Sequence, residues 1–411
     1  MTPAPIDLLI SNANRVISGS SGVYDGVSIA IDSGKIKAMG PASEIAGLFH
    51  PAEEVDARGR LVTPGFVDSH THLVFGGDRS AEFVQRCAGA DYEEIAAAGG
   101  GIRASVRMTR ETSLENLVAS ARPRLSRMIA SGSTTIEIKS GYGLDLETEL
   151  RMLRAIRELA KDSPAEIVAT FMGAHETPDE YRQDRSEYLR LVCEEMIPAV
   201  AAEGLAEFCD VFCERGVFDP AESRAVLEAG KRHGLRPKIH ADEMAASGGS
   251  TVAAEVGAVS ADHLMMTPDE GIQALREAGV VATLLPGTTF YLSKPTYAPA
   301  RKMLDAGLRV ALATDRNPGS CTVENMLLII GLAVQRMGMT PIEAIEAATF
   351  GGAFALGREK SCGSLETGKR ADLILWDVAD ENQLVYEFAN NLKRSVWAGG
   401  RRISDVLADS E

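Results

Sequence analysis

The chain has 411 residues, of which 45% are hydrophobic, so it is long enough to bury a large core and to form more than one domain. Its formal net charge of −16 argues against nucleic acid as a partner, because phosphate groups need a basic surface. No apolar stretch approaches the ~20 residues that a bilayer-spanning helix needs, which argues against a membrane protein.

The two ends of the chain share a pattern of short apolar strands separated by glycine-rich turns. Strands are predicted near the N-terminus at residues 6–11, 13–17, 27–32 and 35–39, and near the C-terminus at 372–377, 396–398 and 401–405. We therefore predict one small β-domain, a β-sandwich, built from residues 1–60 together with residues 361–411.

Between these ends, short β-branched runs alternate with amphipathic helical segments. Eight strands are predicted, at residues 65–70, 134–139, 166–172, 208–213, 237–240, 258–263, 280–285 and 309–313. Helices are predicted at 114–130, 147–159, 186–202, 220–233, 268–278 and 299–306, and Pro123 should kink or split the first of them. Eight buried strands, each followed by a helix, predict an α/β fold, a (β/α)₈ TIM-like barrel over residues 61–360. A doubly wound open sheet is the alternative.

Polar residues recur where the predicted barrel strands end. His70 and His72, in Phe-Val-Asp-Ser-His-Thr-His, end the first strand, and side chains two positions apart point the same way, ~7 Å apart along the strand. The other strand ends contribute Lys139, His175, His240, His263 and Asp315. Catalytic residues of such barrels gather at this face. Five of the seven histidines lie there, and His50 and His233 are interpreted as solvated or structural side chains.

These strand-end residues predict a metal site. The predicted ligands are three imidazoles and one carboxylate: His70, His72, His240 and Asp315. This donor set suits zinc or iron and leaves a position for water, whose pKa the ion would lower towards ~7. His175 and His263 are alternative ligands, or groups that hold a substrate oxygen or transfer protons. Glu243, three residues after His240, is either a proton acceptor or a solvated loop carboxylate.

The cysteines indicate a reducing compartment. The six cysteines show no C-x-x-C spacing and no signal peptide precedes them, so we expect reduced thiols in a cytoplasmic protein.

Several segments resemble the amidohydrolase superfamily. They are Pro-Gly-Phe-Val-Asp-Ser-His-Thr-His at 64–72, a strand-ending His, a late Ala-Thr-Asp at 313–315 and Gly-Ser-Leu-Glu-Thr-Gly-Lys-Arg-Ala-Asp-Leu at 363–373. More narrowly, residues 75–79, 138–143, 173–176, 239–243 and 314–320 together, in this order, resemble the imidazolonepropionase family of that superfamily. The resemblance extends across nearly the whole chain. It implies metal-dependent hydrolysis of 4-imidazolone-5-propanoate, an anionic imidazolone, to N-formimidoyl-L-glutamate in histidine degradation.

The resemblance also implies roles for individual residues. One zinc or iron(III) ion per subunit would be held by His70, His72, His240 and Asp315. The substrate would be contacted by Arg79, Tyr142, His175, Glu243, Asn317, Gly319 and Ser320, with Arg79 as the directional partner of the propionate. Glu243 would take the proton of the attacking water, Glu243 or Asp315 would pass it to the leaving nitrogen, and His263 or His175 would stabilise the oxyanion.

The absence of a lysine at the end of the fourth strand indicates how many metal ions the site holds. Related binuclear enzymes carry a carboxylated lysine on that strand, whereas here it ends in Cys213-Glu214, which favours one ion. Lys139 ends a different strand and is not predicted to bridge metals. The resemblance further suggests a homodimer.

Two other functions remain open from the sequence. The chain could be another amidohydrolase that acts on a cyclic amide or amidine, such as a hydantoinase-like enzyme or a deaminase. It could also be a catalytically silent barrel that serves as a binding protein, although all four predicted ligands are present.

Overall fold

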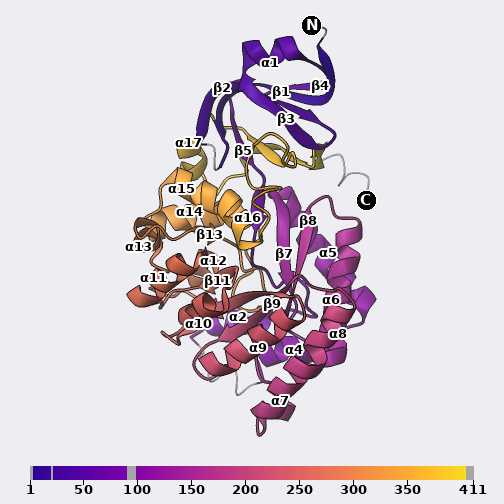
Figure 1. The fold of residues 1–411 in the computed structure, drawn as a ribbon, viewed down its shortest axis with the longest axis vertical. Helices are drawn as coiled ribbons and strands as arrows, with labels where there is room; N and C mark the ends of the chain where they lie inside the picture. The colour runs from indigo at the N-terminus through magenta and orange to yellow at the C-terminus, as the bar shows by residue number, and fades with distance from the viewer. Residues whose placement is uncertain (1–2, 20–21, 90–98, 404–411) are drawn as a thin grey trace.

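The computed structural model describes residues 3–19, 22–89 and 99–403, and these form two eight-stranded sheets. In Figure 1 a mixed sheet, coloured indigo and yellow because both chain ends contribute to it, lies above a larger barrel that contains the middle of the chain. The predicted small β-domain from both ends is therefore present, and its strands join into one mixed sheet.

All eight predicted barrel strands are confirmed. They are β6 (Phe66–Asp68), β7 (Ser133–Lys139), β8 (Glu166–Ala174), β9 (Phe208–Cys213), β10 (Arg236–Ala241), β11 (Ser260–His263), β12 (Val281–Leu284) and β13 (Val310–Leu312). They are parallel and follow one another in sequence order. A doubly wound sheet would reverse its strand order at a switch point, so that alternative is wrong.

Helices cover the outside of the barrel (Figure 1). They are α2 (Ser80–Cys87), α4 (Ile102–Arg110), α5 (Leu114–Ala130), α6 (Leu146–Lys161), α7 (Arg185–Leu191), α8 (Ile197–Ala202), α9 (Pro220–Arg232), α10 (Gly249–Val256), α11 (Asp269–Ala278), α12 (Pro286–Tyr291), α13 (Ala300–Asp305), α14 (Met326–Met337), α15 (Pro341–Glu346) and α16 (Gly352–Ala355). Capping side chains determine where several of these helices begin; Asp219 and Glu222, for example, form a capping box at the N-terminus of α9. Among the described residues, no helix is both long enough and apolar enough to cross a membrane.

Two predicted helices differ from expectation in their interiors. Pro123 does not split α5, because the buried face of Leu117, Ala121 and Leu125 holds the helix against the barrel on both sides of the proline. The segment predicted at 186–202 comprises α7 and α8 joined by a π-helical turn at Val192–Met196. Pro198, at the start of α8, cannot donate an N–H, and a wider turn before it accommodates that loss.

The mixed sheet contains β1 (Ala4–Ile17), β2 (Val23–Asp32), β3 (Lys35–Pro41), β4 (Phe49–Asp56), β5 (Leu61–Pro64), β14 (Leu373–Trp376), β15 (Lys393–Ala398) and β16 (Arg401–Arg402). Strands β4 and β5, and the helices α1 (Ala42–Leu48) and α17 (Glu381–Tyr386), were not predicted. Strand β1 is one strand with a bulge between Ile10 and Ala13, where two strands were predicted. Residues 404 and 405 of the last predicted strand lie outside the described residues.

The mixed sheet packs on the end of the barrel opposite the predicted site. Trp376 of β14 is fully buried, its ring lies 5.8 Å from that of Phe66 on β6, and its indole N–H donates to Thr63 Oγ1 over 2.9 Å. Because Phe66 begins the first barrel strand while the histidines follow its other end, the sheet braces the end of the barrel away from those histidines.

The first and eighth strand ends close the barrel. The main-chain N–H of Asp315 donates to the carbonyl of His70 over 3.0 Å, and that of His72 donates to the carbonyl of Arg316 over 2.9 Å. The segments that carry the predicted ligands therefore seal the ring.

Candidate metal centre

The structure brings five of the strand-end residues together at the carboxyl-terminal mouth of the barrel. His70 and His72 follow β6, His240 lies in β10, His263 ends β11, and Asp315 follows β13. Their relative exposures are between 0 and 4%. We call these five residues the mouth cluster.

The ligand-type atoms of the mouth cluster converge. One nitrogen each from His70, His72 and His240 lie within 4.8 Å of one another, and so do atoms of His70, His263 and Asp315. The Nε2 atoms of His72 and His240 are 3.3 Å apart. Asp315 Oδ1 lies 3.5 Å from His70 Nε2 and 3.8 Å from His72 Nε2.

This arrangement fits a metal ion. Two nitrogens bound tetrahedrally to zinc are separated by roughly 3.4 Å, close to the spacing of the two Nε2 atoms. Buried His70 Nε2 has no hydrogen-bond partner, as expected of an atom that faces a cation. Burial lowers the pKa of His70, His72 and His263 well below the usual histidine value, helped most by Lys139, His175 and His240 respectively. These imidazoles are therefore neutral, the form that binds metals.

Hydrogen-bond partners on the side away from the proposed ion orient the carboxylate of Asp315 and the rings of His70 and His240. Asp262 Oδ2 lies 2.6 Å from His70 Nδ1, and Asp210 Oδ1 lies 3.1 Å from His240 Nδ1. The hydroxyl of Thr288 donates to Asp315 Oδ2 over 2.5 Å, so Oδ1 remains free to face the histidines. Neither Asp210 nor Asp262 was predicted from the sequence. Asp210 is the one carboxylate in the apolar strand Phe-Cys-Asp-Val-Phe-Cys, which is a signal that could have identified it, whereas Asp262 stands in Ser-Ala-Asp-His, where only its position beside His263 marks it.

Glu243 and His263 form a pair beside the ligands. Glu243 Oε1 lies 3.6 Å from His263 Nδ1. Burial, followed by the negative charge of Asp315, raises the pKa of Glu243 to about 7. His263 reaches the mouth from a backbone with φ of 78°, an uncommon conformation for a residue other than glycine. A carboxylate with this pKa, beside a neutral imidazole, is suited to exchange protons near neutral pH.

His175 and Tyr142 line the side of the mouth next to His72. The His175 ring stacks on that of His72, with centroids 4.9 Å apart and planes at 18°. Burial lowers the pKa of His175 to about 3, and its Nδ1 lies 3.0 Å from the carbonyl of Gly141. The buried Tyr142 ring lies 5.8 Å from the His72 ring and 5.5 Å from the His175 ring.

Arg79 and the loop after β13 lie at an adjoining hollow. A cavity of ≈ 410 Å³ is lined by Phe75, Asp78, Arg79, Ser80, Phe83, Arg124, Tyr291, Arg316, Pro318 and Thr322. Arg79 pairs with Glu82 at 2.8 Å. Its guanidinium also packs directly against the backbone of Gly319, which has no side chain to hold it away. Asn317 orders this loop, because its Oδ1 accepts the N–H groups of Gly319 and Ser320 over 2.8 and 2.7 Å.

Three remaining predictions concern residues that are not expected to be metal ligands. His50 and His233 are exposed and lie outside the mouth cluster. Lys139 is buried and donates to Glu137 over 2.7 Å and to Asp210 over 2.8 Å. At the end of β9, Glu214 accepts the N–H of Met244 over 2.8 Å, so it holds the loop after His240.

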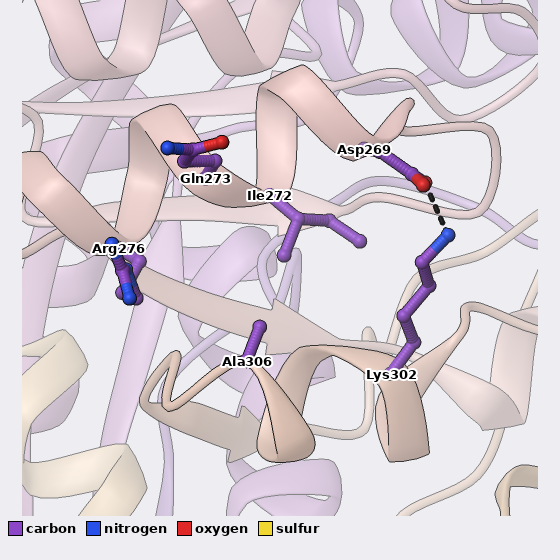
Figure 2. A pocket seen from close by; sticks show the side chains of 6 residues that line it. All are labelled: Asp269, Ile272, Gln273, Arg276, Lys302 and Ala306. Carbon is purple, nitrogen blue, oxygen red and sulfur yellow. Dashed lines mark hydrogen bonds and ion pairs between the residues drawn. The ribbon is translucent and has the colours of Figure 1, made fainter.

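A second hollow lies between α11 and α13 on the outside of the barrel (Figure 2). It is lined by Asp269, Ile272, Gln273, Arg276, Lys302 and Ala306, and Asp269 pairs with Lys302 across it. None of the predicted site residues lines this hollow, so the candidate chemistry belongs to the mouth cluster.

Comparison with known proteins relates most of the chain to one family. The pattern of the amidohydrolase family matches residues 61–403. The chain is 49% identical over 384 residues to the imidazolonepropionase of Geobacillus kaustophilus (strain HTA426), covering 92% of this chain and 90% of that one. It is 47% identical over 416 residues to that of Symbiobacterium thermophilum (strain DSM 24528 / JCM 14929 / IAM 14863 / T), with 98% of both chains covered.

Solved structures share the fold at much lower identity. A 5-methylcytosine deaminase from Klebsiella pneumoniae superposes with a TM-score of 0.73 at 17% identity, covering 96% of this chain and 97% of that one. An adenosine deaminase from Xanthomonas campestris superposes with a TM-score of 0.69 at 19% identity, covering 99% and 98%. These likenesses confirm the architecture of barrel and terminal sheet.

Proposed function

Because the chain belongs to the amidohydrolase family, we propose that its mouth cluster holds one catalytic metal ion. The convergence of the His70, His72 and His240 nitrogens carries this proposal. The ligands would be His70, His72, His240 and Asp315, and His263 would remain free for the reaction. The chain is an imidazolonepropionase, a hydrolase, as its relatives show. Its reaction is hydrolysis of the ring C–N bond of 4-imidazolone-5-propanoate to N-formimidoyl-L-glutamate.

The proposed ion is single, and its identity is zinc or iron. Among the described residues, the end of β9 carries Cys213 and Glu214 where a binuclear relative has a lysine. Lys139 is held by Glu137 and Asp210 and is not available as a bridging ligand. Three imidazoles and one carboxylate serve either metal. When bound, the ion acts as a Lewis acid and lowers the pKa of a water towards ~7.

The proton transfers would be carried by residues on the open side of the mouth cluster. Glu243 in its ionised form accepts a proton from the attacking water at its carboxylate. It then delivers that proton to the ring nitrogen as the C–N bond breaks, with Asp315 as the alternative carrier. His263, 3.6 Å from Glu243, donates to the oxygen that gains negative charge. His175 is the alternative donor, and because its Nδ1 faces the carbonyl of Gly141, it would need a second proton on Nε2 for this role.

The substrate would lie between the mouth cluster and the hollow of Arg79. The guanidinium of Arg79 binds the propionate, because its planar donors match a carboxylate. Tyr142, His175 and Glu243 surround the ring. Asn317, Gly319 and Ser320 form the far wall, where the ordered loop presents main-chain groups.

The activity is tested by following the absorbance of imidazolone propionate as the purified protein consumes it. Hydantoin and guanine serve as controls for the other amidohydrolase reactions. Turnover that is lost with a chelator and restored by zinc or iron supports the proposal. Equal turnover of a substrate without the propionate, or an unchanged rate for Arg79→Ala, would contradict the role of Arg79.

We further propose a cytoplasmic homodimer with two domains, residues 61–360 as the barrel and residues 1–60 with 361–411 as the smaller domain. The six cysteines are free thiols, which suits a reducing compartment. Light scattering of the purified protein tests the dimer, and limited proteolysis tests the domain division.

A further inference from the structure

Beneath the mouth cluster, the barrel interior contains charged side chains that the proposed reaction does not use. They are Glu137, Lys139, Asp210, Lys238 and Asp262, which we call the buried ionic cluster, and each has a relative exposure of 0%. They come from four barrel strands, the adjacent strands β9, β10 and β11 and, beyond β8, strand β7. Burying five charges is costly unless each is paired, so their presence calls for a physical reason.

Lys139 is the centre of this cluster. Its Nζ donates to Glu137 Oε1 over 2.7 Å and to Asp210 Oδ2 over 2.8 Å, and it lies 3.7 Å from Asp262 Oδ2. Two carboxylates lie behind the predicted ligands, and the ammonium group is hydrogen-bonded to one of them, Asp210. Asp262 lies behind His70, and Asp210 lies behind His240.

The two carboxylates determine which ring nitrogen of each histidine faces the mouth. An ionised carboxylate is only an acceptor, so its partner Nδ1 carries the proton and Nε2 keeps a lone pair. Asp210 also accepts the main-chain N–H of His240 over 3.2 Å, which fixes the position of the ring as well as its tautomer. Lys139, which donates to Asp210 over 2.8 Å, keeps this deeply buried carboxylate in place.

We propose that Lys139 is a positioning residue of the metal centre, a proposal that rests on the ligand set given above. Its hydrogen bond holds Asp210 as an acceptor, and through Asp210 it orients His240 with Nε2 towards the ion. It touches neither the substrate nor the ion.

If Lys139 positions the ligands, its removal should weaken metal binding. Charge repulsion considered alone predicts the opposite result, stronger metal binding. An ammonium group close to a bound cation repels it, so losing the charge should strengthen metal binding. Lys238 provides the matched control, because it is equally buried in the same cluster. Its Nζ donates to the carbonyl of Ser69 over 3.0 Å and lies 3.9 Å from Glu137 and 3.8 Å from Asp262, beyond hydrogen-bond distance.

The test compares the zinc affinity of Lys139→Met and Lys238→Met with that of the unaltered protein, measured by chelator competition. We expect Lys139→Met to bind zinc roughly 10- to 100-fold more weakly, the usual effect of losing support behind a ligand. Lys238→Met should bind zinc as tightly as the unaltered protein or more tightly. Unchanged or tighter binding by Lys139→Met, or equal weakening in both variants, would overturn the proposal.

A second variant keeps the test decisive if Lys139→Met does not fold. Asp210→Asn has nearly the same shape but is a weaker, uncharged acceptor for His240. It should also bind zinc at least ~10-fold more weakly and change the visible spectrum of the cobalt-substituted protein, which reports ligand geometry. An affinity and a spectrum identical to those of the unaltered protein would overturn the proposal. If the unaltered protein itself binds no zinc, iron or cobalt, the ligand set fails instead, which is a separate result.

Discussion

The main-chain N–H of Asp315 donates a 3.0 Å hydrogen bond to the carbonyl of His70, so two proposed ligands from opposite ends of the barrel sequence are joined by their own backbones. The bond closes the ring between the first and the eighth strand. A metal ion held by both side chains would reinforce the same closure, which connects metal binding to the stability of the barrel.

Metal removal should therefore lower the thermal stability without unfolding the protein. A ligand that binds only the folded state stabilises it by about 2.7 kcal/mol at 100 times its dissociation constant. Circular dichroism of the chelator-treated protein should show unchanged secondary structure and a reduced Tm that rises with added zinc. His70→Ala should lose this dependence, and His233→Ala, which alters an exposed histidine, should keep it. A Tm that does not depend on metal in the unaltered protein would contradict the proposed site.

Substitution of Gly319 should weaken substrate binding through Arg79. A β-carbon at position 319 would lie 1.9 Å from Arg79 Nη1, so Gly319→Ala must displace the guanidinium. Losing a charge-assisted hydrogen bond costs about 1.5–3 kcal/mol, so kcat/KM should fall roughly 10- to 100-fold, mainly through KM. Gly47→Ala is the matched control, since a β-carbon there meets nothing within 4 Å. Unchanged KM in Gly319→Ala would remove Arg79 from substrate binding.

The activity should rise with pH as Glu243 loses its proton. Burial and the charge of Asp315 raise the pKa of Glu243 to about 7, and only the ionised carboxylate accepts a proton. A bound cation favours the ionised form, so the rising limb of kcat in the metal-loaded enzyme should lie below about 7.

Glu243→Gln tests the same role at fixed pH. It should lower kcat by roughly 10²- to 10⁴-fold and abolish this rising limb, while metal analysis finds the ion still bound. Near-normal turnover with intact metal content would exclude Glu243 from the proton transfers.

Glu149 should support the loop that carries Tyr142. Its buried carboxylate accepts main-chain N–H groups of Gly141, Gly143 and Leu144 at 2.7–3.2 Å. Glu149→Gln replaces one acceptor oxygen with a donor, so we expect a loss of about 1–3 kcal/mol of stability and a several-fold higher KM. Glu147→Gln on the same helix is the control, because that side chain is 87% exposed. Equal effects in the two variants would show that Glu149 has no specific role in the loop.

The sequence by itself was sufficient to predict the barrel. Strands such as β9 and β12 are short, mostly apolar runs that are buried on both faces. The helices between the strands show a helical period and capping residues, so both kinds of element can be predicted from local sequence. The placement of His70, His72, His240 and Asp315 at strand ends followed from the same reading. Strand β4 was missed because most of its residues are exposed and only its pairing with β1 makes it a strand.

The support around the proposed ligands depended on the tertiary structure. Asp262 is 192 positions from His70, and the 2.6 Å contact between them exists because the register of the barrel strands brings them together. The approach of Arg79 to Gly319 likewise depends on the loops after the first and the eighth barrel strands, which lie side by side only in the closed barrel. Local residue patterns determine which segments become strands and helices and which of them end in metal-binding side chains. Pairings between distant strands are set by register and barrel closure, and these are properties of the whole packed chain.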